Sequence, residues 1–333
     1  FYSTLSLIWL MAGWIHKLDI KLMIDLKAKK NFNFDDSGLA SDDEMKGRSL
    51  WVDARIRYAR NKMATICLFT LILICIFSIF GNLFAAYSIE EIDWAILGMT
   101  LEKGYPSFET GHYFGTDEMG RDLYARVVQG SRISLAVGFI GAIISTFVGT
   151  IYGAISGYIG GRLDSLMMRI VDILIAIPFM FVLILFLVVF GRSILMIFVG
   201  IALFSWLGMA RVARGQTMTL KNKEFIEAAR ATGVSQLTIV IRHIVPNLLG
   251  IVIVYGSLMI PGFIMAESFI SFLGLGVQEP NTSWGALISE GAGTMTYGTF
   301  WQLAFPLSFF TVTMFCFYFI GDGLRDAFDP KDR

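Results

Sequence analysis

The chain has 333 residues, of which 55% are hydrophobic and 16% charged, and its mean hydropathy is +0.65. That composition is too apolar for an ordinary soluble domain and predicts an integral membrane protein. The 27 basic and 27 acidic residues balance to a formal net charge of zero, so composition gives no support to a nucleic-acid partner.

The first 46 residues are predicted to form a cytoplasmic or interfacial segment. Residues 1–30 alternate apolar patches with lysines, and the apolar run is short for a membrane crossing, so we expect an interfacial amphipathic helix. The basic lead-in of a cleavable signal peptide is missing. Residues 31–44 mix acidic side chains with Gly and Ser, which is typical of a flexible linker, and residues 47–63 form a basic juxtamembrane segment.

Six apolar stretches within residues 64–333 predict membrane-spanning helices and therefore an all-α membrane protein. They are residues 64–86, 133–159, 166–190, 194–210, 248–275 and 301–320. Three long segments connect them: an outer loop at 87–132, a loop at 211–247 and a second outer loop at 276–300. In the second span, Gly or Ser recurs every fourth residue from Gly141 to Gly161, which makes a ridge that we expect to pack against another helix of this chain.

Basic side chains decide the predicted orientation, because short cytoplasmic loops carry an excess of Lys and Arg. If the N-terminus lies inside, seventeen Lys and Arg flank the cytoplasmic ends of the spans and five lie in the outer loops. Both termini and the loop at 211–247 are therefore predicted to be cytoplasmic. The loop at 276–300 contains no Lys or Arg, and Trp284 and Trp301 suit a membrane interface.

The loop at 211–247 is predicted to fold as a helix, a glycine turn and a second helix. Four residues spaced i, i+3, i+4 and i+7 share one face of the first helix, where two alanines let the backbone of a partner come close. They are Phe225, Ala228, Ala229 and Thr232. Gly233 supplies the C-terminal stop, Ser235 caps the second helix, and Pro246 disfavours helix at the residue before it.

Within this loop, Glu227-Ala228-Ala229 is followed by Gly233 and, thirteen residues later, by Pro246. This pattern resembles the EAA loop of ABC-importer permease subunits. The commonest form of that motif has Ile and Leu where this chain has His243 and Val245, whereas the peptide-importer branch often carries the His. Further stretches that agree with this branch are residues 112–117, 120–122, 271–276, 284–285 and 321–326.

From residue 47 onward, the chain is similar to the C-type membrane subunit of oligopeptide and dipeptide permeases. The resemblance implies a type I ABC-importer permease fold with six transmembrane helices in the bacterial inner membrane. It implies a second homologous permease subunit, two cytoplasmic ATP-binding subunits that hold ATP and Mg, and an extracytoplasmic peptide-binding protein. The residues that would couple to the ATP-binding subunits are Glu227, Ala228, Ala229, Gly233, His243 and Pro246. Peptide is the implied cargo, with nickel chelates and glutathione as open alternatives.

Patterns for catalysis, cofactor binding or metal binding are missing from the sequence. It has no Gly-x-x-x-x-Gly-Lys-Ser/Thr loop for ATP phosphates, so hydrolysis is assigned to partner subunits. His16, His112 and His243 lie in different regions without metal-ligand spacing. The three cysteines lie in apolar runs and are predicted to be packing residues.

Three residues are candidates for the translocation pathway. Pro178 and Pro261 interrupt apolar spans and are expected to kink or break them, either to line a pore or as fixed packing kinks. Glu267 is a candidate for a substrate pathway or gate, because charge at membrane depth is costly. Asp172 is expected near the cytoplasmic end, either as a snorkelling carboxylate or paired locally with Arg169. Two rival functions stay open: a proton-coupled secondary transporter that uses the two carboxylates, and a membrane scaffold without transport.

Overall fold

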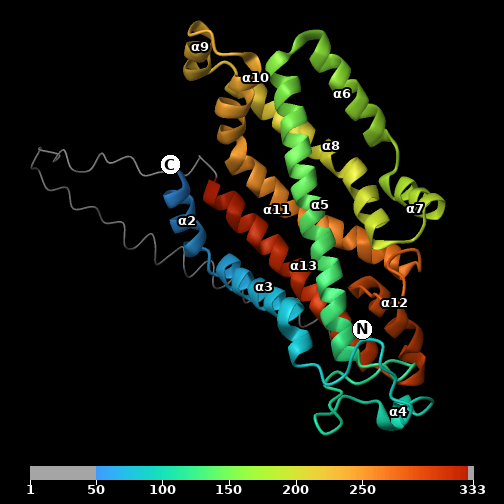
Figure 1. Cartoon of the computed structure of the whole chain (residues 1–333). Helices are drawn as coiled ribbons and strands as arrows, with labels where there is room; N and C mark the ends of the chain where they lie inside the picture. The colour runs from blue at the N-terminus through green and yellow to red at the C-terminus, as the bar shows by residue number, and fades with distance from the viewer. Residues whose placement is uncertain (1–49, 329–333) are drawn as a thin grey trace, which may run out of the picture. The chain divides into compact units, whose positions relative to one another are not determined.

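The computed structural model describes residues 50–328, and these residues are helical apart from the connecting loops (Figure 1). The prediction of an all-α membrane protein is confirmed for this part of the chain. The β-structure in residues 50–328 consists of two isolated β-bridges in the loop at 87–132, which pair Ile92 with Arg121 and Thr116 with Asp122. The predicted N-terminal segment 1–46, with its amphipathic helix and acidic linker, lies outside the described residues.

Among the described residues, five helices are long and apolar enough to cross a membrane, and a bent pair supplies a sixth candidate span. The long helices are α3 (Lys62–Phe80), α5 (Leu123–Ile159), α8 (Ile194–Leu220), α11 (Val245–Phe272) and α13 (Trp301–Phe328). The bent pair is α6 (Gly161–Ala176) and α7 (Phe179–Phe190). The shorter helices are α2 (Leu50–Arg60), α4 (Thr100–Lys103), α9 (Glu224–Ala231), α10 (Gln236–Ile239) and α12 (Trp284–Thr294). Single helical turns follow at Gly81–Leu83, Val240–Ile244 and Met295–Tyr297.

The third predicted span, residues 166–190, is broken at Pro178, one of the two prolines that were expected to kink or break their helices. α6 and α7 meet at an angle of 78°. Ile177 is extended between them, with φ −82° and ψ 125°, because the ring of Pro178 disfavours helix at the preceding residue. At Pro261 the expected break does not occur: α11 continues through it, and the neighbouring Ile260 contacts α5. Packing against a neighbouring helix on both sides of a proline stabilises such a position.

Helix α5 is long enough to extend beyond a membrane at its ends. It begins at Leu123, well before the predicted start of this span at residue 133, because the Asp122 carboxylate caps it by accepting a hydrogen bond from the Ala125 N–H at 2.8 Å. The helix has 37 residues. At about 1.5 Å per residue its length is about 55 Å, against roughly 30 Å for the hydrocarbon core of a bilayer.

The glycine ridge of α5 packs against α8 of the same chain, as predicted, between Gly149 and Gly157. The approach is closest at Gly153, where a Cβ atom would lie 2.2 Å from the carbonyl oxygen of Ala210. The two backbones are therefore in direct contact, and no side chain fits between them. Gly161, the last residue of the predicted ridge, lies beyond the end of α5 and begins α6.

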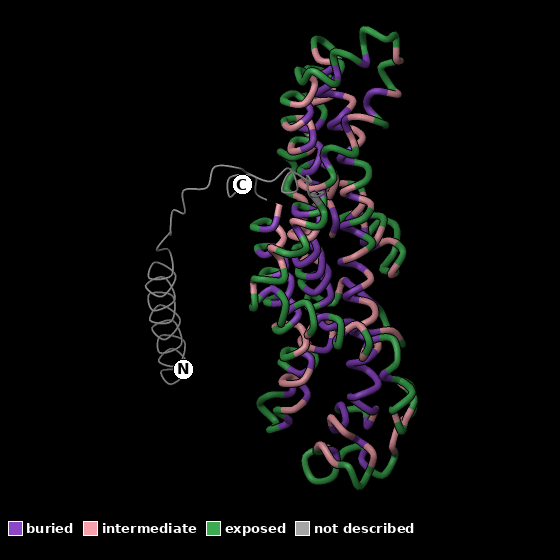
Figure 2. The backbone as a smooth tube through the Cα atoms, turned by 90° about the vertical axis from the view of Figure 1, so that its left-hand side faces the viewer, coloured by how far each residue is buried: buried purple, intermediate pink, exposed green. Residues whose placement is uncertain are grey.

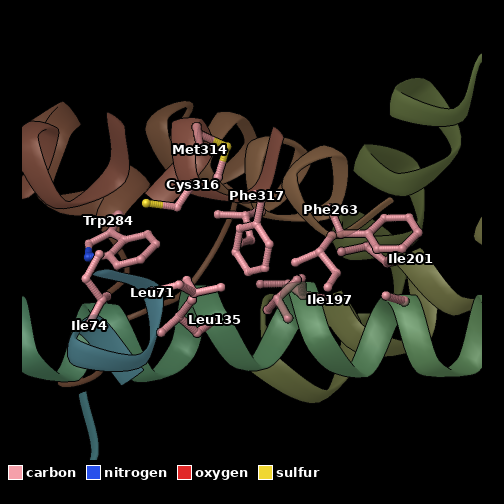
Figure 3. Close-up of a cluster of buried hydrophobic side chains, with 14 of the residues drawn as sticks. Leu71, Ile74, Leu135, Ile197, Ile201, Phe263, Trp284, Met314, Cys316 and Phe317 are labelled. Carbon is pink, nitrogen blue, oxygen red and sulfur yellow. The ribbon is translucent and has the colours of Figure 1, made fainter. Parts of the chain in front are cut away.

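Buried side chains form a main core between α3, α5, α7, α8, α11, α12 and α13, part of which Figure 3 shows. Cys67 and Cys316 are buried in this core and Cys75 packs against it, which confirms the cysteines as packing residues. In Figure 2, buried residues follow the inner sides of the helices and exposed residues follow the outer sides. Many of the exposed residues are large and apolar, including Phe69, Phe147 and Phe181, as expected for helices that face lipid.

Figure 1 places the predicted inner and outer segments at opposite ends of the helical unit. One end carries α9, α10 and the turn between α5 and α6. The other end carries the loop that contains α4 together with α12. We call residues 276–300, with α12 at their centre, the outer hairpin.

Candidate functional site in the loop between α8 and α11

Helix α9 ends in the glycine turn that the sequence predicts. The N–H of Val234 donates to the carbonyl of Ala229 at 3.1 Å and the N–H of Gly233 to that of Arg230 at 3.0 Å. Gly233 has φ +78°, a left-handed conformation that residues with a Cβ atom rarely adopt. The side chain of Ser235 then accepts a hydrogen bond from a backbone N–H of α10, so the predicted stop and cap are both confirmed.

The second helix of this loop was predicted to end before Pro246. In the structure it runs on into the membrane helix α11. Pro246 is the second residue of α11, and Val245 before it is helical. The turn just before, Val240–Ile244, is π-helical, and the N–H of Val245 donates to the carbonyl of Val240, five residues back. This wider turn accommodates the missing proline N–H without a break. His243 lies in it and is half-buried.

The predicted small-residue face of α9 is divided between the interior and the surface. Ala229 is buried together with Ile226, whereas Ala228 and Thr232 are exposed and Phe225 is 42% exposed. The prediction that all four spaced residues share a partner-facing side is therefore wrong for Ala229, because the helix needs one apolar side for its own packing. Glu227 is exposed beside Ala228.

The buried side of α9 belongs to a second core, separate from the main core. This second core is composed of Ala154, Tyr158, Met209, Ala213, Ile226, Ala229, Ile239, Val240, Ile244, Leu248 and Val252. Its members come from α5, α8, α9, α10, the π-helical turn and α11. The loop is therefore packed onto the ends of three long helices and is not a free surface loop.

Two basic side chains join this loop to the last turn of α5. Arg230 Nε donates to the hydroxyl of Tyr158 at 3.1 Å, and the guanidinium carbon lies 5.1 Å from the centre of the Tyr158 ring. Lys221 Nζ donates to the carbonyl of Gly157 at 3.1 Å. Sequence reasoning missed both contacts, because partners 72 and 64 residues apart leave no local spacing signal.

A buried carboxylate fixes the turn between α5 and α6 to α8. Arg214 donates to the two oxygens of Asp164 at 2.5 and 2.6 Å, and Ser156 Oγ donates to the same carboxylate at 2.6 Å. Two parallel bonds to one guanidinium define the geometry of the pair as well as its energy. α5, α6 and α8 are thus held together at the end of the bundle that carries α9.

Asp172 pairs with Arg211 of α8 at 2.5 Å, and not with Arg169 as the spacing within α6 predicts. Both partners are about half exposed. An exposed pair of this kind contributes about 0–1 kcal/mol and resembles a surface ion pair more than a buried proton relay.

Glu267 is fully buried inside the subunit, with 0% of the residue exposed. Its carboxylate accepts hydrogen bonds from Ser134 Oγ of α5 at 3.0 Å and from Ser271 Oγ of α11 at 2.7 Å. The hydroxyl of Ser268 lies 3.3 Å away. These serines, up to 133 residues distant in sequence, supply the partners that sequence reasoning could not name.

The three pathway candidates lie on two different elements. Pro178 is exposed at the break between α6 and α7, whereas Pro261 and Glu267 are buried in α11. Their participation in a pathway stays a prediction.

The outer loop before α5 is ordered by buried polar contacts. His112 Nδ1 lies 2.9 Å from Asp122, and the imidazole stacks on the ring of Tyr87 with centroids 4.2 Å apart. Burial raises the pKa of Asp122, while hydrogen bonds from His112 and from the Ala125 N–H oppose that rise. The cap of α5 is thereby connected to a loop residue ten positions earlier.

The sequence of this chain is similar to those of known transport proteins. A family profile described as "Binding-protein-dependent transport system inner membrane component" matches residues 149–333, and one described as "N-terminal TM domain of oligopeptide transport permease C" matches residues 49–99. The oligopeptide transport system permease protein OppC of Escherichia coli K12 is 56% identical over 290 residues, which cover 87% of this chain and 94% of that protein. The chain belongs to the ABC-importer permeases of the oligopeptide and dipeptide transport family.

Other relatives of this permease are named for dipeptide and glutathione transport systems. The dipeptide transport system permease protein DppC of Bacillus subtilis is 41% identical over 281 residues, covering 84% of this chain and 86% of that protein. The glutathione transport system permease protein GsiD of Shigella flexneri is 40% identical over 285 residues, covering 85% and 91%. The permease is a multi-pass inner-membrane subunit, and the resemblance stated from the sequence is confirmed. Residues 50–328 contain no cluster of His, Cys, Asp and Glu that could hold a metal ion.

Proposed function

We propose that this permease is one of two homologous membrane subunits of an ATP-driven peptide importer and forms half of its translocation pathway. The names of its relatives support peptide cargo, since two transport oligopeptides or dipeptides and one transports glutathione, itself a small peptide. An extracytoplasmic binding protein delivers the cargo, in keeping with the family description. Membership of the ABC family favours ATP over a proton gradient as the energy source.

The observation that carries the proposal is a helix that is exposed on one side and anchored on the other. The exposed side of α9, with Phe225, Glu227 and Ala228, offers a docking face to an ATP-binding subunit. The anchored side, with Ile226 and Ala229, shares one core with α5, α8 and α11. Force applied to the docking face therefore reaches three long helices at once. ATP and Mg are held by the two ATP-binding subunits, and this chain performs no bond chemistry.

The distribution of basic residues supports a cytoplasmic position for the docking face. The end of the bundle with α9 carries Lys221, Lys223 and Arg242, while the loop at 276–300 at the opposite end has no Lys or Arg. Both chain termini are assigned to the same cytoplasmic side. A cytoplasmic ATP-binding subunit then has direct access to α9.

Charge reversal at Glu227 is expected to weaken docking of the ATP-binding subunits. The side chain is exposed on the docking face, so Glu227→Lys leaves the second core intact and changes only the surface that the partner meets. A like charge opposite a basic partner group costs several-fold in affinity or more. The amount of ATP-binding subunit that co-purifies with the tagged permease measures the effect. Unchanged co-purification contradicts a docking role, and Glu224→Lys, on the first turn of the same helix, tests whether any added charge suffices.

Removal of the Arg230 contact is expected to reduce transport while docking persists. Arg230→Ala removes a hydrogen bond and a cation–π contact to Tyr158, each worth about 0.5–1.5 kcal/mol. Tyr158→Phe removes only the hydrogen bond and should have an intermediate effect. ATP-driven uptake in proteoliposomes is the measurement, with co-purification of the ATP-binding subunit as the control. Wild-type uptake by Arg230→Ala contradicts a role in transmission.

Affinity purification in mild detergent tests the proposed assembly directly. The expected result is a complex of this chain with a second permease and ATP-binding subunits, whose ATPase activity rises when the peptide-loaded binding protein is added. A preparation without an ATP-binding subunit, or uptake that follows a proton gradient and ignores ATP depletion, overturns the proposal.

A further inference from the structure

Two serine hydroxyls connect the buried Glu267 to the outer hairpin. Ser134 Oγ of α5 donates to Glu267 Oε2 and accepts from the backbone N–H of Trp284 at 3.2 Å. Ser271 Oγ of α11 donates to Glu267 Oε1 and accepts from the backbone N–H of Val277 at 3.3 Å. A hydroxyl has a single hydrogen, so a serine that accepts from an N–H is free to donate its own hydrogen to the carboxylate. Each oxygen of Glu267 is thereby linked through one serine to the hairpin.

The hairpin also packs tightly against α5 and α11 around this carboxylate. Trp284, expected at a membrane interface, is instead fully buried in the main core (Figure 3), and its indole N–H donates to Ser131 Oγ of α5 at 3.0 Å. A Cβ atom at Gly285 would lie 2.2 Å from the carbonyl oxygen of Ser268 in α11. Backbone therefore meets backbone, and the hairpin has no room to slide.

A second set of contacts holds the hairpin to α5 nearer the outer surface. The buried Arg126 donates from Nη1 and Nη2 to the two carboxylate oxygens of Glu290 at 2.6 and 3.1 Å. The amide of Gln129 donates to Asn281 at 2.8 Å. Because these contacts lie at other points along the hairpin than the Glu267 contacts, the hairpin cannot pivot about either set alone.

We propose that Glu267 is a positioning residue that fixes the outer hairpin to α5 and α11, so that these elements move as one rigid body during transport. Lifting the hairpin would leave the backbone N–H groups of Trp284 and Val277 without the serine acceptors that Glu267 orients, and a buried polar group without partners is strongly unfavourable. Opening of the outer side then takes place between this body and the rest of the assembly. Glu267 acts through the hairpin and does not touch the cargo. This inference rests on the proposed transport function.

A cross-link between the hairpin and α5 tests whether the two ever separate. In a variant whose three natural cysteines are replaced by Ala, Gln129→Cys and Asn281→Cys place thiols where the wild-type side chains are hydrogen-bonded. A short, reducible bifunctional methanethiosulfonate joins them in the assembled transporter in proteoliposomes. The cross-linked transporter is expected to retain ATP-driven uptake. Loss of uptake that a reducing agent restores shows that the hairpin must lift, and overturns the proposal.

Substitutions at the carboxylate test whether Glu267 is the residue that fixes the hairpin. In Glu267→Ala, we expect slower cross-linking of the same cysteine pair and at least a several-fold loss of uptake. Glu267→Gln, which keeps one acceptor oxygen, should be intermediate. Ser134→Ala and Ser271→Ala each remove one link and serve if Glu267→Ala does not fold. Ser289→Ala removes an exposed bond from the hairpin to the carbonyl of Phe272 in α11, and as the control for loss of a single hairpin contact it should slow cross-linking less than Glu267→Ala.

Two results would contradict the role of Glu267: wild-type uptake, or an unchanged cross-linking rate, in Glu267→Ala. Co-purification of the ATP-binding subunits is expected to stay at the wild-type level in all of these variants. If co-purification is missing already in the wild type, the proposed function has failed and not the role of Glu267.

Discussion

Replacement of Gly233 by valine is expected to abolish most ATP-driven peptide uptake while the transmembrane helices stay folded. Gly233 has φ +78°, and nothing lies within 4 Å of a Cβ atom placed there, so the penalty comes from the backbone and not from a clash. A left-handed conformation costs an L-residue roughly 1–2 kcal/mol, and a β-branched side chain is a greater outlier. The turn between α9 and α10 then rearranges, and we expect uptake to fall about tenfold or more.

The matched control for this experiment is Gly233→Asn, because asparagine tolerates the left-handed region far better than valine. Uptake in proteoliposomes and stimulation of ATPase activity by the peptide-loaded binding protein are the two measurements. Asn is expected to retain both and Val to lose both. If Gly233→Val transports peptide and stimulates hydrolysis normally, the turn has no part in coupling.

Replacement of Gly153 by leucine is expected to lower the thermal stability of the subunit more than any other substitution suggested here for this chain. Its Cβ atom would lie 2.2 Å from the Ala210 carbonyl oxygen and 2.8 Å from both the Ala213 Cβ and the Arg214 N. Backbone atoms cannot move aside as a flexible side chain can, so α5 and α8 must separate. Overpacking typically costs about 1–3 kcal/mol, which corresponds to a fall in melting temperature of roughly 1–4 °C for a chain of this length.

Thermal unfolding of the detergent-purified subunit, followed by light scattering or intrinsic fluorescence, measures this effect. Gly208→Leu is the control, because Gly208 lies on α8 and nothing is within 4 Å of its Cβ position. The control should unfold near the wild-type temperature. Equal melting temperatures for the two leucine variants would show that the contact between α5 and α8 is not as close as described.

Local sequence signals predicted the local features of this protein. The apolar stretches located the membrane helices, Gly233 the turn and Ser235 the cap, because each depends on a few neighbouring residues. The spacing of glycines on α5 also predicted a close helix contact, because a ridge without side chains lets the backbone of a second helix approach. The family resemblance then supplied a function for the loop.

Contacts between distant segments could not be predicted. The pairs Arg230–Tyr158 and Glu267–Ser134 join residues 72 and 133 positions apart, and only the folded chain brings them together. The effect of each proline on its helix was also ambiguous from the sequence. Pro178 and Pro261 both lack a backbone N–H, but only Pro178 breaks its helix, because the packing around the two residues differs. The division of the α9 face likewise depends on where its neighbours lie.

Because α5 is long, this single helix contacts both the outer hairpin and the second core. The helix is unbroken over 37 residues, with the Arg126 and Ser134 contacts near one end and Tyr158 at the other. A tilt of roughly 5° about one end of a rod about 55 Å long displaces the opposite end by roughly 5 Å. If the proposed function holds, a small rotation imposed by the ATP-binding subunits at the end with α9 becomes a shift of several ångströms at the end with the outer hairpin.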